Sequence, residues 1–221
     1  MNVQEATTRR LPDLKERHLP ENCRETINTI LKETYGYEQF RNLEIYDDLS
    51  KGKEKLCISQ GQLIENVILE AEKAWKSETQ VDNILLTAPT GSGKSLLFQL
   101  PAIYLGKEYN LLTIVVSPLK ALIVDQVESL QELGYARVAY ASSDLSPEQK
   151  MEVYRQVREG EIDLFYLSPE LLLSYDIKHF VGERRIGLVV VDEAHTVTTW
   201  GKEFRVDYWF LGRYLTALKQ T

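Results

Sequence analysis

Short apolar runs alternate with longer amphipathic stretches from residue 83 onward. The runs are rich in Val, Ile, Leu, Tyr and Phe without regular polar alternation, which is typical of strands buried on both faces. We predict strands at 84–87, 111–117, 138–141, 163–168 and 187–192. Between them, the pattern predicts helices at 94–104, 119–133, 147–159 and 169–180. This alternation predicts an α/β fold with a parallel β-sheet and helices on both of its faces.

The first 80 residues have a different pattern. Apolar positions at helical spacing predict helices at 21–35 and 62–75. The segment between them, 45–59, is polar and charged, and we can assign it only as an exposed connection. We therefore divide the chain into an N-terminal helical region, residues 1–80, and an α/β domain, residues 81–221.

Serine–proline pairs mark several of the predicted helix starts. Ser117-Pro118 and Ser168-Pro169 follow strands directly, and Ser146-Pro147 opens a third helix with capping-box spacing. Helices that follow parallel strands begin at the carboxyl edge of the sheet, where ligands bind and free N–H groups attract phosphates. These pairs also begin helices that bind nothing, so their functional role stays open.

A glycine-rich segment, Ala88-Pro89-Thr90-Gly91-Ser92-Gly93-Lys94-Ser95, lies between the first predicted strand and a helix. This is the context of a phosphate-binding loop, although the first position is alanine instead of the usual glycine. The glycines allow a tight turn that points successive N–H groups at phosphates. Lys94 adds a positive charge, and the Ser95 hydroxyl can ligate Mg²⁺. The residues expected to contact the nucleotide are Thr90, Gly91, Ser92, Gly93, Lys94 and Ser95.

The last predicted strand ends in Asp192-Glu193-Ala194-His195, which places two carboxylates at the ligand-binding edge of the sheet. Asp192 is a candidate Mg²⁺ ligand, usually through water, and Glu193 is a candidate base for the attacking water. Two acids at a strand end can instead cap a helix, and His195 can be an ordinary core or loop histidine. The glycine-rich loop upstream favours the catalytic interpretation.

Composition and charge narrow the class of protein. With 221 residues, 43% hydrophobic and 27% charged, the chain is globular and is neither disordered, collagenous nor a coiled coil. Its net charge of −7 argues against a surface that binds nucleic acid over its whole extent, but allows a local basic site. Cys23 and Cys57 lack metal-ligand spacing. Without a signal peptide or a long apolar run, we expect a cytoplasmic protein with no membrane partner.

The motifs together resemble those of superfamily 2 helicases, and the closer match is the RecQ family of DNA helicases. Asp192-Glu193-Ala194-His195 and the glycine-rich loop account for the first resemblance. Val115–Leu119, with Asp125-Gln126-Val127, is similar to the family's motif Ia, and Phe165–Glu170 to the segment before its Walker B strand. The resemblance implies a RecA-like P-loop NTPase domain that uses ATP and Mg²⁺, with Lys94 and Glu193 as catalytic residues.

Thr199–Tyr208 resembles the family's aromatic-rich loop, which couples single-stranded DNA binding to ATP hydrolysis. Its aromatic rings and arginine also suit stacking on unpaired bases. The family has His-Asp where this chain has Lys202-Glu203, and Pro where it has Val206. An amphipathic helix packed on its sheet is the alternative for this segment. The residues expected to bind DNA or to couple it to hydrolysis are Ser117, Pro118, His195, Trp200, Phe204 and Arg205.

Thr34–Arg41 resembles the family's adenine-recognition motif, which implies that Tyr37 stacks on the base and that Arg41 assists. The family has a glutamine three residues after the arginine, where this chain has Glu44. Gly61-Gln62 resembles the missing piece, as though residues 45–59 were inserted. A glutamine offers both a donor and an acceptor to adenine, whereas a glutamate only accepts. We therefore expect Gln62 to contact the adenine.

The resemblance implies the first motor domain of an ATP-dependent RecQ-like DNA helicase, acting on single-stranded or partly duplex DNA. Such motors hydrolyse ATP between two RecA-like domains. The chain ends before the family's motif III, so we expect an incomplete domain, weakly active or inactive alone, whose partner is a second RecA-like domain. Two alternatives stay open: a nucleotide-binding interaction module without turnover, and a superfamily 2 RNA helicase or duplex translocase.

Overall fold

The computed structural model describes residues 23–46, 55–76, 83–86, 91–194 and 211–215. In these residues a parallel sheet has the strand order β4-β5-β3-β6, and β1 and β2 form an antiparallel pair. The strands are β1 (Asn42–Tyr46), β2 (Lys55–Ser59), β3 (Leu112–Val116), β4 (Val138–Ala141), β5 (Leu164–Leu167) and β6 (Ile186–Val191). The helices are α1 (Glu25–Tyr35), α2 (Gln60–Trp75), α3 (Leu96–Tyr109), α4 (Lys120–Glu132), α5 (Pro147–Glu159), α6 (Pro169–Ser174) and α7 (Ile177–Val181).

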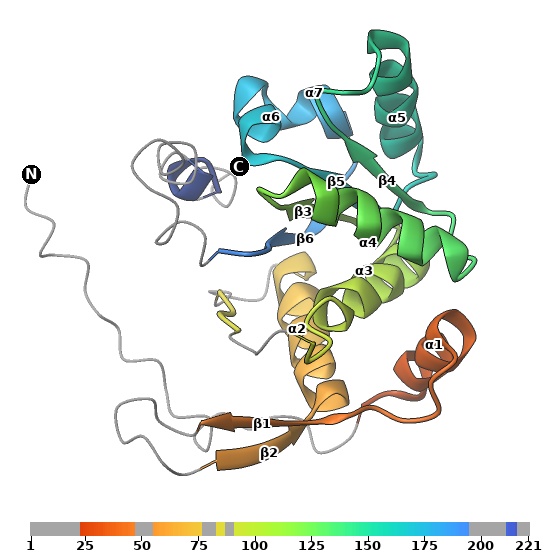
Figure 1. Ribbon diagram of the computed structural model, residues 1–221, viewed down its shortest axis with the longest axis vertical. Helices are drawn as coiled ribbons and strands as arrows, with labels where there is room; N and C mark the ends of the chain where they lie inside the picture. The colour runs from red at the N-terminus through yellow and green to blue at the C-terminus, as the bar shows by residue number, and fades with distance from the viewer. Residues whose placement is uncertain (1–22, 47–54, 77–82, 87–90, 195–210, 216–221) are drawn as a thin grey trace, which may run out of the picture.

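Helices cover both faces of the parallel sheet (Figure 1). On one face, α3 and α4 pack in a core that includes Val115 and Tyr166 and also holds α1 and α2. On the other face, α5, α6 and α7 pack in a second core that includes Ile114 and Phe165. Neighbouring strand residues point to opposite faces of the sheet, and helices cover both faces, so β3 is buried at every position. The predicted α/β fold, with helices on both faces of a parallel sheet, is confirmed.

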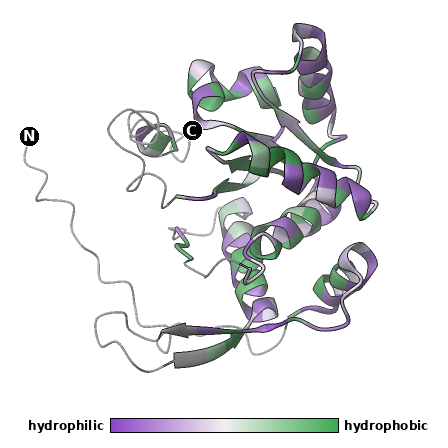
Figure 2. Ribbon diagram, viewed as in Figure 1, coloured by the Kyte–Doolittle hydropathy of each residue, from purple (hydrophilic) through white to green (hydrophobic). Residues whose placement is uncertain are grey.

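Two of the three serine–proline pairs cap helices as the sequence predicts, whereas Ser117 does not, because the N-cap of α4 is Leu119, without a side-chain hydrogen bond. The Ser146 hydroxyl accepts a hydrogen bond from the Gln149 N–H, and Gln149 Oε1 accepts one from the Ser146 N–H, so α5 begins with a complete capping box. Figure 2 shows that α5 is largely hydrophilic, and it buries Tyr154 and Val157 toward the sheet. Ser168 caps α6 by accepting a hydrogen bond from the Leu171 N–H. Local capping therefore fixes where these helices begin.

Two expectations for regular structure are wrong. Residues 83–86 form no strand, and Leu85 is 72% exposed, so this run is not buried on both faces. The helix predicted at 169–180 is two helices, because Tyr175 is extended and Asp176 starts α7 by accepting a hydrogen bond from the Lys178 N–H. The described helices are otherwise close to their predicted positions.

Within residues 45–59, which the sequence pattern assigned only as an exposed connection, the described residues 45–46 and 55–59 belong to the antiparallel β1–β2 hairpin. Asn42 lies opposite Ser59, and the pairing continues to Tyr46 opposite Lys55. Figure 1 shows the hairpin at the end of the molecule away from α5. The boundary near residue 80 stays a prediction, although α1 and α2 share a hydrophobic core with α3. No helix in the described part of the chain is long and apolar enough to cross a membrane.

Candidate nucleotide site

The described part of the glycine-rich loop has the backbone that phosphate binding requires. Gly91 and Gly93 have φ of 79° and 75°, the left-handed region in which glycine is unstrained. Ser95 precedes α3 and makes no capping hydrogen bond, so helix capping does not occupy its hydroxyl. The Ser92 hydroxyl is buried and has no hydrogen-bond partner within the described ranges. Thr90 lies outside the described residues.

Gln60, which the sequence analysis did not single out, connects this loop to Arg41, in the segment that resembles an adenine-recognition motif. Its side chain is buried, accepts a hydrogen bond from the Arg41 N–H (3.2 Å) and donates one to the Ser92 carbonyl (3.0 Å). A Cβ atom on Gly93 would lie 2.7 Å from Gln60 Nε2, so the glycine is also needed for this close approach. Gln60 therefore joins two segments that are far apart in the sequence.

Gln62, which we expected to contact the adenine, takes part in a helix cap, and its contact with the base stays a prediction. Its Oε1 atom accepts a hydrogen bond from the Ser59 N–H (3.1 Å), and the two residues form the capping box of α2. The Ser59-x-x-Gln62 spacing is itself a capping-box signal, and it was available in the sequence. That signal would have identified Gln62 as the glutamine that caps α2.

Tyr37 has an aromatic face available for a base. Its ring is 50% exposed and stacks on Tyr35, with 6.5 Å between ring centroids and 14° between planes. The Arg41 guanidinium carbon lies 6.0 Å from the centroid of the Tyr37 ring. Glu44, the other candidate for contacting adenine, lies in β1 with an exposed side chain. Arg41 therefore lies near the Tyr37 ring and is joined through its N–H to Gln60, which contacts the phosphate loop at Ser92.

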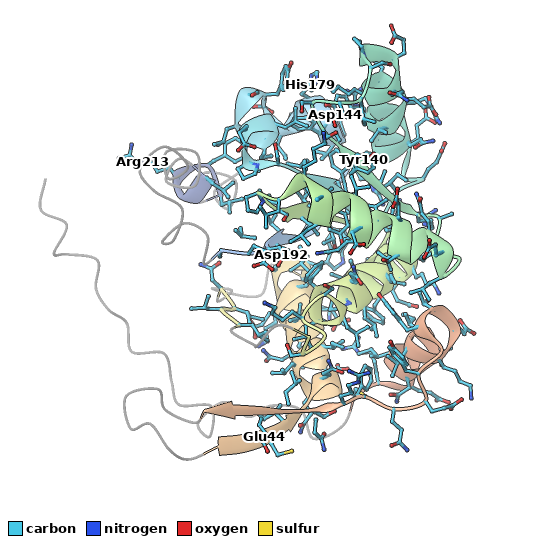
Figure 3. The ribbon with its side chains drawn as sticks, viewed as in Figure 1. Glu44, Tyr140, Asp144, His179, Asp192 and Arg213 are labelled. Carbon is cyan, nitrogen blue, oxygen red and sulfur yellow. The ribbon has the colours of Figure 1, made fainter. Side chains whose placement is uncertain are left out.

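The two candidate catalytic carboxylates follow β6, and Figure 3 shows Asp192 at the end of that strand. The Asp192 N–H donates to the Val116 carbonyl (2.9 Å), which holds the residue beside β3. Asp192 Oδ1 accepts from the Glu193 N–H (2.8 Å), and Oδ2 accepts from the Gln126 amide (3.2 Å). Glu193 has φ of 50°, a conformation that costs energy for a residue with a side chain and is frequent at functional sites.

The donor groups suit magnesium together with phosphates. Mg²⁺ prefers oxygen ligands and usually retains several waters, so one hydroxyl and one carboxylate are enough when phosphates supply the rest. Ser95 provides a hydroxyl that is not engaged in capping. Each Asp192 oxygen accepts one protein hydrogen bond and retains acceptor capacity for a water. Ser95 and Asp192 therefore fit Mg²⁺ bound with a nucleotide.

Two of the residues expected to contact DNA, Ser117 and Pro118, lie in the described part of the chain. Ser117 is 1% exposed, its N–H donates to the Leu167 carbonyl, and its hydroxyl has no partner among the residues described. Pro118 is partly buried at the start of the following turn. The hydroxyl of Ser117 thus lies beneath the surface in this conformation. His195, Trp200, Phe204 and Arg205 lie outside the described residues.

A family model for DEAD/DEAH box helicases matches residues 69–219. The chain belongs to this family. Within it, the helicase domain is of the superfamily 2, RecQ-like type, and the match includes the glycine-rich loop and the Asp192-Glu193-Ala194-His195 motif. The fold described above has the α/β, RecA-like architecture of such domains.

Several relatives are ATP-dependent DNA helicases. The helicase domain is 30% identical to RecQ of Haemophilus influenzae over 187 residues, covering 85% of this chain and 25% of that protein. It is 34% identical to RecQ of Synechocystis over 191 residues, covering 86% of this chain and 33% of that protein. It is 38% identical to helicase Q5 of Mus musculus over 143 residues, covering 62% of this chain and 14% of that protein. The chain thus spans a third or less of the length of these relatives.

A solved structure of the DUF1998 helicase MrfA, bound to DNA and AMPPNP, superposes with a TM-score of 0.44 and 20% identity. The alignment covers 72% of this chain and 23% of that one. At this score the superposition adds nothing to the assignment.

Proposed function

We propose that this chain is the first RecA-like motor domain of an ATP-dependent RecQ-like DNA helicase. It binds Mg-ATP and single-stranded DNA, and it couples hydrolysis to strand separation together with a second RecA-like domain. The observation that supports this most is the Gln60 bridge, because one buried side chain joins the Arg41 backbone to the Ser92 carbonyl. A rigid connection between a base-binding and a phosphate-binding segment suits recognition of a whole nucleotide.

In this proposal, Tyr37 and Arg41 contact the adenine, and Gln60 holds their segment against the phosphate loop. A glutamine amide has two donor hydrogens and an oxygen with two lone pairs. Gln60 uses one donor for the Ser92 carbonyl and one lone pair for the Arg41 N–H, and its burial keeps both bonds away from water. Tyr37 stacks on the ring through its exposed face.

Hydrolysis is assigned to residues at the phosphate end. The loop N–H groups and Lys94 bind the β- and γ-phosphates, while Ser95 and Asp192 hold Mg²⁺, which neutralises phosphate charge when bound. Glu193 orients the attacking water and accepts its proton. The left-handed backbone at Glu193 is a strained conformation of the kind that is frequent at functional sites, which supports this role.

Two substitutions in a longer chain that includes the second domain test the proposal. Lys94→Ala should weaken ATP binding by removing a charge from the phosphates, whereas Glu193→Gln should retain binding and abolish DNA-stimulated turnover. Calorimetry measures the binding and phosphate release measures the turnover. Equal loss of binding in both variants would make Glu193 a structural anchor. A parent chain that binds ATP but never hydrolyses it, even with DNA, would be the interaction module.

A further inference from the structure

A chain of hydrogen-bonded polar side chains, of which Gln99 and Tyr166 are buried and the others partly buried, runs between α1 and the Asp192 carboxylate. Tyr35 donates its hydroxyl hydrogen to Gln99 Oε1 (3.3 Å), and Gln99 Nε2 donates to the Tyr166 hydroxyl (3.1 Å). Tyr166 donates to Gln126 Oε1 (3.0 Å), and Gln126 Nε2 donates to Asp192 Oδ2 (3.2 Å). These residues come from α1, α3, β5, α4 and the end of β6.

The direction of every hydrogen bond in this chain follows from its last member. An ionised carboxylate only accepts, so Gln126 must turn its amide nitrogen toward Asp192 and its oxygen toward Tyr166. Tyr166 then donates to Gln126 and must accept from Gln99. Burial raises the pKa of Tyr166, which keeps its hydroxyl protonated and able to donate. Each donation polarises the next group, so the bond that reaches Asp192 is strengthened by those before it.

The same series of hydrogen bonds is also connected to Ser95, the other candidate metal ligand. The Gln99 N–H donates to the Ser95 carbonyl (2.9 Å), so the glutamine lies one helical turn after Ser95. Its side chain is 6% exposed and Tyr166 is fully buried, so neither has much freedom to move. Gln99 and Tyr166 therefore link the Ser95 turn to the Gln126 amide through the interior of the domain.

We propose that Tyr166 and Gln126 are positioning residues that orient the Asp192 carboxylate for the Mg²⁺ bound with the nucleotide. The proposal rests on the function proposed above, because it concerns the metal of that same site. Neither residue needs to touch the metal: Gln126 holds one carboxylate oxygen, and Tyr166 holds Gln126 in the only amide orientation that can donate. Hydrogen-bond partners of metal-binding carboxylates affect metal affinity by about 10–100-fold when removed.

The experiment measures how much Mg²⁺ strengthens nucleotide binding, without using turnover. The dissociation constant of a non-hydrolysable ATP analogue is measured by calorimetry in EDTA and again in excess Mg²⁺. The constant in EDTA divided by the constant in Mg²⁺ gives the ratio that reports the coupling between metal and nucleotide binding. Gln126→Leu should lower this ratio by about tenfold or more while leaving the constant in EDTA unchanged. Gln131→Leu, an exposed position on the same helix, should leave the ratio as in the parent.

A second pair of variants separates positioning from general loss of stability. Tyr166→Phe removes only the hydroxyl, and it should lower the ratio in the same direction as Gln126→Leu. Tyr135→Phe removes another buried hydroxyl that donates to a carboxylate, that of Asp163 (2.8 Å), and it should reduce thermal stability without changing the ratio. Thermal unfolding of each variant identifies any that fail to fold.

The outcomes are distinguishable. A parent that gains nothing from Mg²⁺ would contradict the proposed function itself. A parent with strong Mg²⁺ enhancement whose ratio survives both Gln126→Leu and Tyr166→Phe would overturn the positioning role. An effect of Gln126→Leu alone would also overturn it, because Tyr166 would then have no part in orienting the carboxylate.

Discussion

The Gln60 bridge allows the sharpest test of nucleotide recognition. Gln60→Ala removes an acceptor from the Arg41 N–H and a donor from the Ser92 carbonyl. It also removes the side chain that lies against Gly93, so the loop loses its support on that side. We expect the variant to lose both stability and the ability to distinguish bases.

The expected magnitude follows from the two contacts. A typical intramolecular hydrogen bond contributes about 0.5–1.5 kcal/mol, and a buried group left unpaired costs about 1–3 kcal/mol. Because Gln60 is 2% exposed, water cannot readily replace the lost partners, and we expect a loss of about 2–3 kcal/mol of unfolding free energy. The preference for ATP over GTP should disappear, because the segment that holds Tyr37 and Arg41 would lose its connection to the phosphate loop.

Gln62→Ala is the matched control, since it removes the glutamine two positions away. It breaks only the returning half of the α2 capping box, which costs about 0.5–1 kcal/mol, and should leave the base preference intact. Urea unfolding gives the stabilities, and competitive titration with ATP and GTP gives the preference. A preference lost in Gln62→Ala and retained in Gln60→Ala would refute the assignment and restore the expectation from the sequence.

Three further predictions concern other parts of the chain. In a longer chain with the second domain, Trp200→Ala should retain basal ATPase activity and lose most of the DNA-stimulated increment; unchanged stimulation in a phosphate-release assay would make this loop a packing element. Burial opposes ionisation of Glu72, but hydrogen bonds, first from Arg24, leave its pKa below the ordinary value of 4.5. Its stabilising effect should therefore be complete above that pH and be lost on acidification; acid titrations monitored by circular dichroism should show a shallower loss in Glu72→Gln. Gly106→Ala should destabilise the chain by about 1–3 kcal/mol in urea, because the new methyl group would overlap the buried Asp163 side chain, and wild-type stability would contradict this.

The fold could be predicted where local signals and burial agree. The strand at Val138–Ala141 and the helix at Pro147–Glu159 have the predicted bounds, because apolar runs and serine–proline caps act within a few residues of each other. The strand expected at 84–87 failed because periodicity cannot show whether a short apolar run finds a second layer to cover it. Leu85 remains mostly exposed.

The candidate site was predictable in its residue types but not in all its contacts. The glycines, Lys94, Ser95 and the paired acids follow from spacing alone. The choice between Gln60 and Gln62 depends on which side chain reaches Ser92, a long-range contact that a motif match cannot resolve. The Gln126–Asp192 hydrogen bond was equally hidden, since the motif resemblance names both residues without indicating that they meet.

The β1–β2 hairpin explains how extra sequence can enter an adenine-recognition motif without separating its two ends. The chain leaves the motif at Arg41 and returns at Gln60, and the backbones of these two residues meet, with the Gln60 N–H donating to the Arg41 carbonyl (2.9 Å). Because Asn42 and Ser59 pair at the base of the hairpin, the excursion between them closes on itself. The segment between Arg41 and Gln60 can therefore change in length and composition during evolution at little cost to the proposed nucleotide site.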